Sequence, residues 1–285
     1  MITTGMIADS GAWIAILIGV VGSAVIHLSQ GILRLSFFRR AAGRAMEARR
    51  LFILGTVLNL SAPLWVVVAN RFAPTVFYTS VYATGLLVLL VFSCRKLGHC
   101  PGRRDYLGAF LLIAGVALLA RHILAVPPPA MNTVNPAGIL VAAGVGLGVV
   151  WVAIRAGLRG GWLLGGLGGF YLAVDSLLKG IAQFDGEAPA FLPSTGFGIF
   201  LFATSFLGAG LAFGMTQLAH HRGARASETI AAYDAAYVAF PVLWFCCVAG
   251  QQGVSVALLL GLAALLLGVA LLAAADISGH PSAGE

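Results

Sequence analysis

Charged side chains are scarce in this sequence. Only 9% of its 285 residues are Asp, Glu, Lys or Arg, whereas an average soluble domain contains about 25%. Because a water-soluble fold needs polar side chains over much of its surface, so few charges cannot cover one. The shortage excludes an ordinary soluble domain, and the mean hydropathy of +0.97 directs attention to the lipid bilayer.

Cysteine is also scarce, and its spacing gives no disulfide framework. Three side chains of one basic loop, Cys94, His99 and Cys100, hint at a metal site. They leave a tetrahedral ion without a fourth ligand. The metal therefore stays unknown, and we expect no cofactor. The remaining cysteines, Cys246 and Cys247, are adjacent within an apolar run.

Long apolar runs are what the sequence has in abundance. Each is about 20 residues long, enough to cross a hydrocarbon core of about 30 Å. Helices satisfy every backbone polar group within one segment, as lipid requires. No basic residue precedes the first run, so we expect it to remain as a helix rather than to be cleaved. The sequence predicts an all-α polytopic membrane protein with nine transmembrane helices, at residues 11–33, 51–69, 72–93, 105–126, 136–155, 162–183, 195–219, 228–249 and 253–274.

The basic residues predict the orientation of these helices. Lys and Arg concentrate in alternate loops, which in membrane proteins face the cytoplasm. We therefore predict an outside N-terminus and a cytoplasmic C-terminus, in the inner (plasma) membrane of a bacterium. Because the charges are spread over separate loops and form no single face, nucleic acid is not an expected partner. Fourteen of the seventeen basic residues follow this pattern: Arg34, Arg39, Arg40, Arg44, Arg49, Arg50, Arg95, Lys96, Arg103, Arg104, Arg155, Arg159, Arg222 and Arg225.

An internal repeat relates the two ends of the chain. Residues 107–120 and 260–273 are identical at nine of fourteen positions, at an offset of 153. A second echo, at an offset of 149, places Gln30-Gly31-Ile32 against Lys179-Gly180-Ile181. Partner spans lie five apart and so cross the membrane in opposite directions, as in many secondary transporters. We expect a first repeat in residues 1–126, an outer loop and extra span in 127–159, and a second repeat with a cytoplasmic tail in 160–285.

Short motifs carry a family resemblance. Span 1 ends in Ser29-Gln30-Gly31-Ile32-Leu33-Arg34, span 3 begins at Phe72-Ala73-Pro74, and span 6 carries Leu178-Lys179-Gly180. Spans 4 and 9 share a Gly-six-residues-Gly pattern. This combination resembles the drug/metabolite transporter superfamily, and within it the NIPA-type magnesium transporters. The resemblance implies two inverted helical halves, transport by alternating access, and Mg²⁺ or a related cation as substrate.

Six polar residues within the predicted spans are candidates for a transport path. Ionisable groups inside a membrane are costly and usually functional. At a rise of about 1.5 Å per residue, His27, Asn59 and Asp234 fall in one inner polar layer. Asp175 and Tyr78 fall in an outer layer about 10 Å away. The sixth candidate is Lys179, which follows Asp175 by four residues.

Two pairings among these candidates suggest different roles. Matching depth favours a contact between His27 and Asp234, and a histidine titrates near neutral pH, so the pair is a candidate proton-sensitive gate. Asp175 and Lys179 share one helix face. They form either a structural pair, with Lys179 extended outward along the helix, or a substrate contact. Both glycine-rich runs, at 144–148 and 165–169, favour close helix packing, and Pro63 and Pro241 predict kinks in spans 2 and 8.

These observations favour a secondary transporter over an enzyme, because no catalytic constellation is recognisable. The expected partners are the lipid bilayer, a cation or other small-molecule substrate, and a second copy or another subunit of a membrane complex. Three alternatives remain open from the sequence: a carrier of a neutral metabolite, a non-transporting membrane subunit, and an enzyme acting on lipid-linked substrates.

Overall fold

A computed structural model of the chain describes residues 3–98, 102–125, 131, 134–156, 160–184, 190–224, 226–248 and 253–274. Over these residues all regular structure is helical and no strand occurs. The helices are α1 (Thr3–Ala41), α2 (Ala45–Leu60), α3 (Ala62–Asn70), α4 (Thr75–Thr79), the 3-10 helix η1 (Tyr82–Gly85), α5 (Leu86–Lys96), α6 (Arg103–Ala125), α7 (Pro136–Arg155), α8 (Gly161–Gln183), α9 (Gly196–His221), α10 (Ala226–Leu243), the π-helix η3 (Trp244–Val248) and α11 (Val256–Ala274).

Seven helical segments are long and apolar enough to cross a membrane, which confirms the predicted all-α integral membrane protein. They are Gly11–Ala41, Ala45–Asn70, Thr75–Lys96, Arg103–Ile123, Gly161–Gln183, Gly196–His221 and Glu228–Cys246. The two other predicted spans correspond to shorter apolar helices, Pro136–Val152 and Val256–Leu272.

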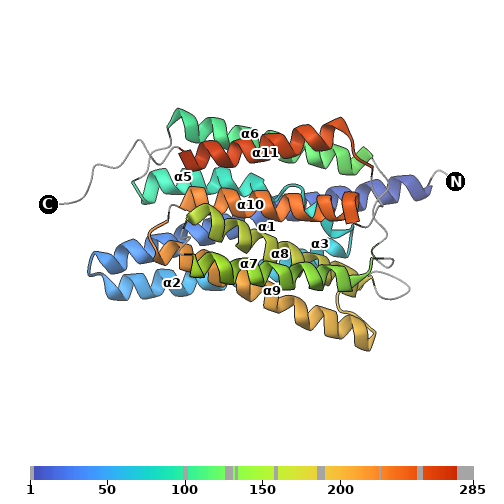
Figure 1. Ribbon diagram of the computed structural model, residues 1–285, viewed down its shortest axis with the longest axis horizontal. Helices are drawn as coiled ribbons and strands as arrows, with labels where there is room; N and C mark the ends of the chain where they lie inside the picture. Colours follow the sequence, from blue (N-terminus) through green and yellow to red (C-terminus); the bar gives the residue numbers. More distant parts are fainter. Residues whose placement is uncertain are drawn as a thin grey trace.

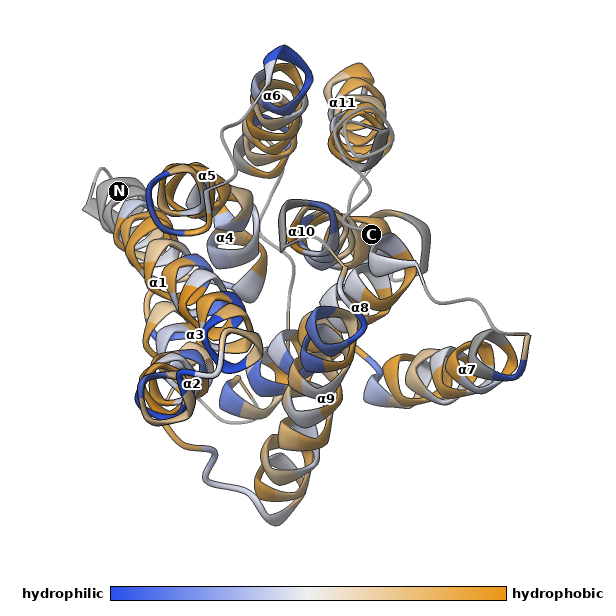
Figure 2. Ribbon diagram, turned by 90° about the vertical axis from the view of Figure 1, so that its left-hand side faces the viewer, coloured by the Kyte–Doolittle hydropathy of each residue, from blue (hydrophilic) through white to orange (hydrophobic). Residues whose placement is uncertain are grey.

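The helices run roughly along the long axis of the molecule, and α8 and α10 lie at its centre (Figures 1 and 2). Inside the molecule, 72% of the α8 segment and 78% of the α10 segment are buried, against 17% for the α2–α3 segment and 28% for α9. Figure 2 shows α2, α7 and α9 at the periphery. A peripheral helix exposes many apolar side chains, as a lipid-facing surface requires. Polar residues in α8 and α10 are therefore shielded from both water and lipid.

Two predicted single spans are broken helices. Span 2 divides at Ser61 into α2 and α3, with Pro63 in the first turn of α3, where its missing N–H costs little. Span 3 consists of α4, η1 and α5. The hydroxyls of Thr79 and Thr84 bond to carbonyls three residues earlier in this region, and such local bonds compete with regular helix. Hydropathy predicted the length of these spans, and Pro63 predicted the interruption of span 2. The interruption of span 3 was not predicted.

The segments that carry the longer sequence repeat pack against each other. α6 and α11 lie side by side (Figure 2). A Cβ atom added to Gly108 would lie 3.0 Å from the carbonyl oxygen of Gly268, and one added to Gly268 would lie 2.8 Å from that of Gly108. Gly115 and Gly261 are related in the same reciprocal way, at 2.8 and 3.1 Å. The Gly-six-residues-Gly pattern thus lets two antiparallel backbones touch.

Candidate functional site

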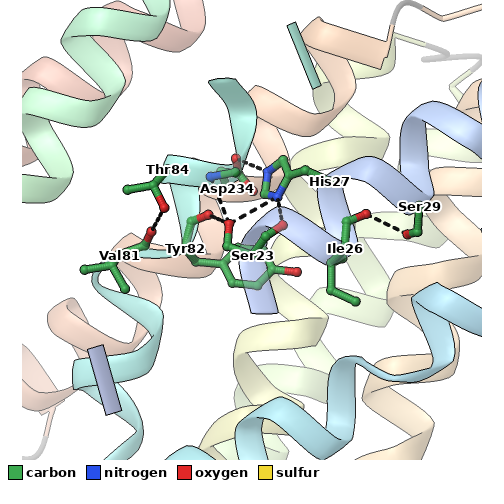
Figure 3. Close-up of polar contacts among 9 residues, drawn as sticks. Ser23, Ile26, His27, Ser29, Val81, Tyr82, Thr84 and Asp234 are labelled. Carbon is green, nitrogen blue, oxygen red and sulfur yellow. Dashed lines mark hydrogen bonds and ion pairs between the residues drawn. The ribbon is translucent and has the colours of Figure 1, made fainter. Parts of the chain in front are cut away.

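His27 and Asp234 form an ion pair in the interior, as their matching depths predicted. His27 Nε2 lies 2.8 Å from Asp234 Oδ2, and the two side chains are 1% and 0% exposed. The pair joins α1 to α10, which are 207 residues apart at this point (Figure 3). Gly85 lets η1 approach α1 closely, because a Cβ atom at this position would collide with the His27 ring and with Ser23.

The contact of the second ring nitrogen of His27 indicates where the hydrogen atoms of this pair lie. His27 Nδ1 lies 2.8 Å from the backbone carbonyl oxygen of Ser23. A carbonyl only accepts hydrogen bonds, so Nδ1 carries a hydrogen. The contact between Nε2 and Asp234 then needs one further proton, on either the imidazole or the carboxyl group. The pair therefore shares one proton, and its loss would leave an Asp234 carboxylate facing a neutral imidazole.

Four buried tyrosines surround this pair. The His27 and Tyr82 ring centroids are 5.4 Å apart, and Tyr82 meets Tyr237 edge-on at 4.6 Å. Tyr78 stacks beside Tyr82 at 5.9 Å, and Tyr233 beside Tyr237 at 6.4 Å. Within this site, the Tyr82 hydroxyl and Asp234 Oδ1 have no hydrogen-bond partner among the described residues. The space lined by His27, Tyr82, Tyr233 and Asp234 has no room for a water molecule.

A wider cavity adjoins this space. It has a volume of about 230 Å³ and lies between α1, α2, α3, α8, α9 and α10. Ile26, Gln30 and Tyr233 line both spaces. Asn59, which was predicted to share a layer with His27 and Asp234, lines only the cavity and donates a 3.2 Å hydrogen bond to Ser29. The cavity gives a small molecule room immediately beside the ion pair.

Asp175 and Lys179 form the second buried ion pair, with Lys179 Nζ donating to Asp175 Oδ1. Both side chains are 0% exposed. The expectation that Lys179 extends outward is wrong. Its ammonium bends back along α8 to the carboxylate and lies 4.2 Å from the ring centroid of Phe206 on α9. Cation–π attraction and the ion pair together compensate for burial, so no route to the membrane surface is needed.

Polar contacts join neighbouring helices at both ends of the region that contains the two ion pairs. At one end, Arg34 of α1 donates to the carbonyl oxygens of His220 and Gly223 at the end of α9, at 2.7 and 3.2 Å. His220 Nε2 also lies 3.3 Å from Gln30 Oε1. These contacts, defined by Gln30, Arg34, His220 and Gly223, are termed the arginine lock.

The opposite end carries a second set of contacts, termed the amide lock. Gln183 at the end of α8 accepts a 2.9 Å hydrogen bond from Asn70 at the end of α3, and it donates to the carbonyl oxygen of Val67 at 3.1 Å. Thr75 donates to Asn70 at 2.8 Å and to the carbonyl oxygen of Ser176 at 3.2 Å. Each lock therefore ties one helix, α1 or α8, to the last turn of a neighbouring span.

Tyr78 was a predicted candidate, whereas Tyr82, Tyr233 and Tyr237 were not predicted from the sequence. The four tyrosines include two pairs at a spacing of four, Tyr78 with Tyr82 and Tyr233 with Tyr237, a signal of one shared helix face. Within the described chain, no three His, Cys, Asp or Glu side chains form a group that could hold a metal ion. Cys94 is half-buried, whereas His99 and Cys100 lie outside the described residues.

Comparisons with protein-family models, curated proteins and solved structures return no significant match to this chain. Functional inference therefore rests on its own residues.

Proposed function

We propose that the chain is a secondary transporter of the drug/metabolite type that moves a small cation across a membrane by alternating access. The observation that carries this proposal is the placement of two equivalent locks on either side of a buried, proton-sharing ion pair. An alternating-access carrier needs one closure on each side of its substrate site, and inverted repeats supply such closures in equivalent positions.

The sequence repeat supports the equivalence of the two locks. The offset of 149 residues that aligns Gln30 with Lys179 also aligns Arg34 with Gln183. These two residues are the centres of the arginine lock and the amide lock. Arg34 lies in span 1 and bonds to His220, near the end of α9 in span 7. Gln183 lies in span 6 and bonds to Asn70, which ends α3 in span 2. Each residue therefore contacts the second span of the other repeat. The reciprocal glycine contact between α6 and α11 supports the same pseudo-twofold relation.

The proposed arrangement has nine spans with inverted halves. α7 and α11 contain 20 and 19 residues, which at about 1.5 Å per residue approach the thickness of a hydrocarbon core. The first half contains α1 to α6, the second contains α8 to α11, and α7 is the extra span. With the basic loops in the cytoplasm, the arginine lock is the inner closure and the amide lock is the outer one.

Exchange of a proton for a cation at Asp234 is the proposed coupling step. While the pair holds its proton, Asp234 is neutralised by His27 at 2.8 Å. Loss of that proton leaves an uncompensated buried carboxylate, which is energetically costly until another cation pairs with it. The groups facing His27 are Asp234 on α10, Tyr82 on η1 and Ser23 on its own helix. Asp234 is the one carboxyl group among these, so the competition is between one proton and one substrate cation.

Magnesium is the first cation to test, because the nearest family resemblance suggests it. One carboxylate with one free oxygen suits a cation that keeps much of its hydration shell, which Mg²⁺ does readily. Uptake into proteoliposomes containing the purified protein is expected for the wild type and is expected to be lost in Asp234→Asn. Glu47→Gln is the matched carboxylate control, because Glu47 pairs with Arg39 and Arg44 far from the site.

Cross-linking tests the locks separately from the substrate. In a cysteine-free background, a short bifunctional thiol reagent should join Asn70→Cys to Gln183→Cys and arrest uptake, and cleavage of the linker should restore it. Uptake that continues through a completed cross-link would contradict alternating access. Absence of uptake of Mg²⁺, other metal ions and organic cations by folded protein would favour the non-transporting subunit.

A further inference from the structure

Two adjoining cavities lie at the end of the molecule that carries the first basic loop. One, of about 380 Å³, lies between the end of α1 and the start of α2. The other, of about 370 Å³, lies between the end of α1 and the end of α9. Phe37 and Arg40 line both, so the two cavities meet at these residues. The remaining lining includes Arg49 and Phe52 in the first cavity and Arg34, His220 and His221 in the second.

These cavities carry positive charge that the protein does not neutralise. Glu47 is the single acidic residue between positions 34 and 50. It is already bound by Arg39 at 3.3 Å and Arg44 at 2.6 Å. Neither Arg40 nor Arg49 has an ion pair or side-chain hydrogen bond among the described residues, and both are exposed. An anionic ligand would therefore find two available guanidinium groups, which bind phosphate in a bidentate geometry.

A buried histidine also lines the second cavity. His220 is 1% exposed, lines the second cavity, and its Nδ1 has no hydrogen-bond partner within the described structure. An unpaired buried polar atom is costly and usually indicates a missing partner. His220 Nε2 lies 3.3 Å from Gln30 Oε1, which only accepts, so Nε2 carries the ring hydrogen and Nδ1 is an acceptor. A headgroup hydroxyl would supply the donor that Nδ1 lacks, while the phosphate contacts Arg40.

Aromatic side chains distinguish a lipid from a soluble anion. Phe37 lines both cavities and Phe52 lines the first, and neighbouring Phe38 is 48% exposed. A free phosphate ion gains nothing from these rings. An anionic phospholipid would place its phosphate among the arginines and its glycerol and acyl chains along the phenylalanines, because basic pockets at the cytoplasmic surface combine both contacts.

We propose that these two cavities form a binding site for the headgroup of one anionic phospholipid of the cytoplasmic leaflet. The inference rests on the proposed orientation of the chain, and it does not require transport. Because Arg34 and His220 belong to the arginine lock, the bound headgroup would also reinforce the contact between α1 and α9.

The test measures binding of phosphatidylglycerol to the purified full-length protein by native mass spectrometry, together with the melting temperature in detergent. Phosphatidylcholine and inorganic phosphate are the comparison ligands. The wild type should bind phosphatidylglycerol in preference to both and melt at a higher temperature with it. An arginine beside the bound headgroup strengthens anionic-lipid binding by a factor of about five, so Arg40→Gln with Arg49→Gln should weaken binding about 25-fold.

Arg50→Gln is the matched control, because Arg50 is exposed beside Arg49 but lines neither cavity. It should retain wild-type affinity. Equal loss in Arg50→Gln would show a general charge effect and overturn the site, as would unchanged affinity in the double variant. Equal binding of inorganic phosphate would overturn the lipid assignment. If the double variant does not fold, Arg40→Gln alone should still lose about fivefold.

Discussion

His27–Asp234 and Asp175–Lys179 are both fully buried pairs of a carboxylate with a basic side chain, and they are built in opposite ways. The first joins two helices that are distant in the sequence, whereas the second closes within one turn of α8. The first contains a histidine, which can be neutral near pH 7, and the second contains a lysine, which is normally charged there. The His27–Asp234 pair joins two helices and can lose its charge, so it suits a part of the protein that moves. The Asp175–Lys179 pair stays charged within one helix, so it suits a part that does not move.

The largest expected effect is a difference in the free energy of unfolding between variants of the two pairs. Asp175→Asn leaves the Lys179 ammonium buried without its counter-charge, and removing one member of a buried pair costs about 3–5 kcal/mol. Asp234→Asn leaves a histidine that can become neutral, so we expect a smaller cost of about 1–3 kcal/mol. Unfolding of the purified variants in a denaturing detergent measures both. A larger loss in Asp234→Asn would reverse the assignment of the fixed and the moving pair.

A double substitution sharpens the interpretation of the α8 pair. Replacement of a whole buried ion pair by apolar residues of similar size is often neutral or stabilising. Asp175→Leu combined with Lys179→Met should therefore recover about 2–4 kcal/mol relative to the single Asp175→Leu variant. The same unfolding assay detects this recovery. If the double variant transports cations normally, the pair is structural; if it folds but does not transport, Asp175 and Lys179 belong to the path.

The pH dependence of uptake should follow the histidine pair alone. At low pH the pair keeps its proton and Asp234 cannot accept a cation, so cation affinity should rise between about pH 5 and pH 8. His27→Gln removes the group that shares this proton and should make affinity nearly constant over that range. Uptake assays across pH measure the effect. An unchanged pH profile in His27→Gln would contradict proton–cation competition at Asp234.

The smallest effects distinguish two tyrosines near the two pairs. The Tyr237 hydroxyl lies 2.8 Å from Ser176 Oγ, so Tyr237→Phe should cost about 1 kcal/mol. The Tyr82 hydroxyl has no partner within the described structure, so Tyr82→Phe should change stability by less than about 0.5 kcal/mol. Cation affinity provides the second measurement. A drop in affinity for Tyr82→Phe alone would place its hydroxyl at the substrate.

Contacts of the candidate site were predictable from the sequence where they follow from spacing along one helix or from distance to the helix ends. The Asp175–Lys179 pair follows from a spacing of four, and its formation is confirmed. His27 and Asp234 were matched by distance from the helix ends, and their contact is also present. Asn59 was predicted to share a layer with this pair but lines the neighbouring cavity, because depth along a helix does not specify rotation about it. The direction of Lys179 was missed because Phe206 comes from another helix.

The amino-acid sequence by itself determined the helical membrane class, because low charge and long apolar runs leave the backbone no other way to satisfy its hydrogen bonds in lipid. It also determined the glycine pattern that α6 and α11 use to touch. Only the tertiary structure decided which polar side chains meet. The break of span 3 into α4, η1 and α5, and the packing of α1 against α10, bring Ser23, His27, Tyr82 and Asp234 together. Those contacts depend on packing between distant segments, which local periodicity does not encode.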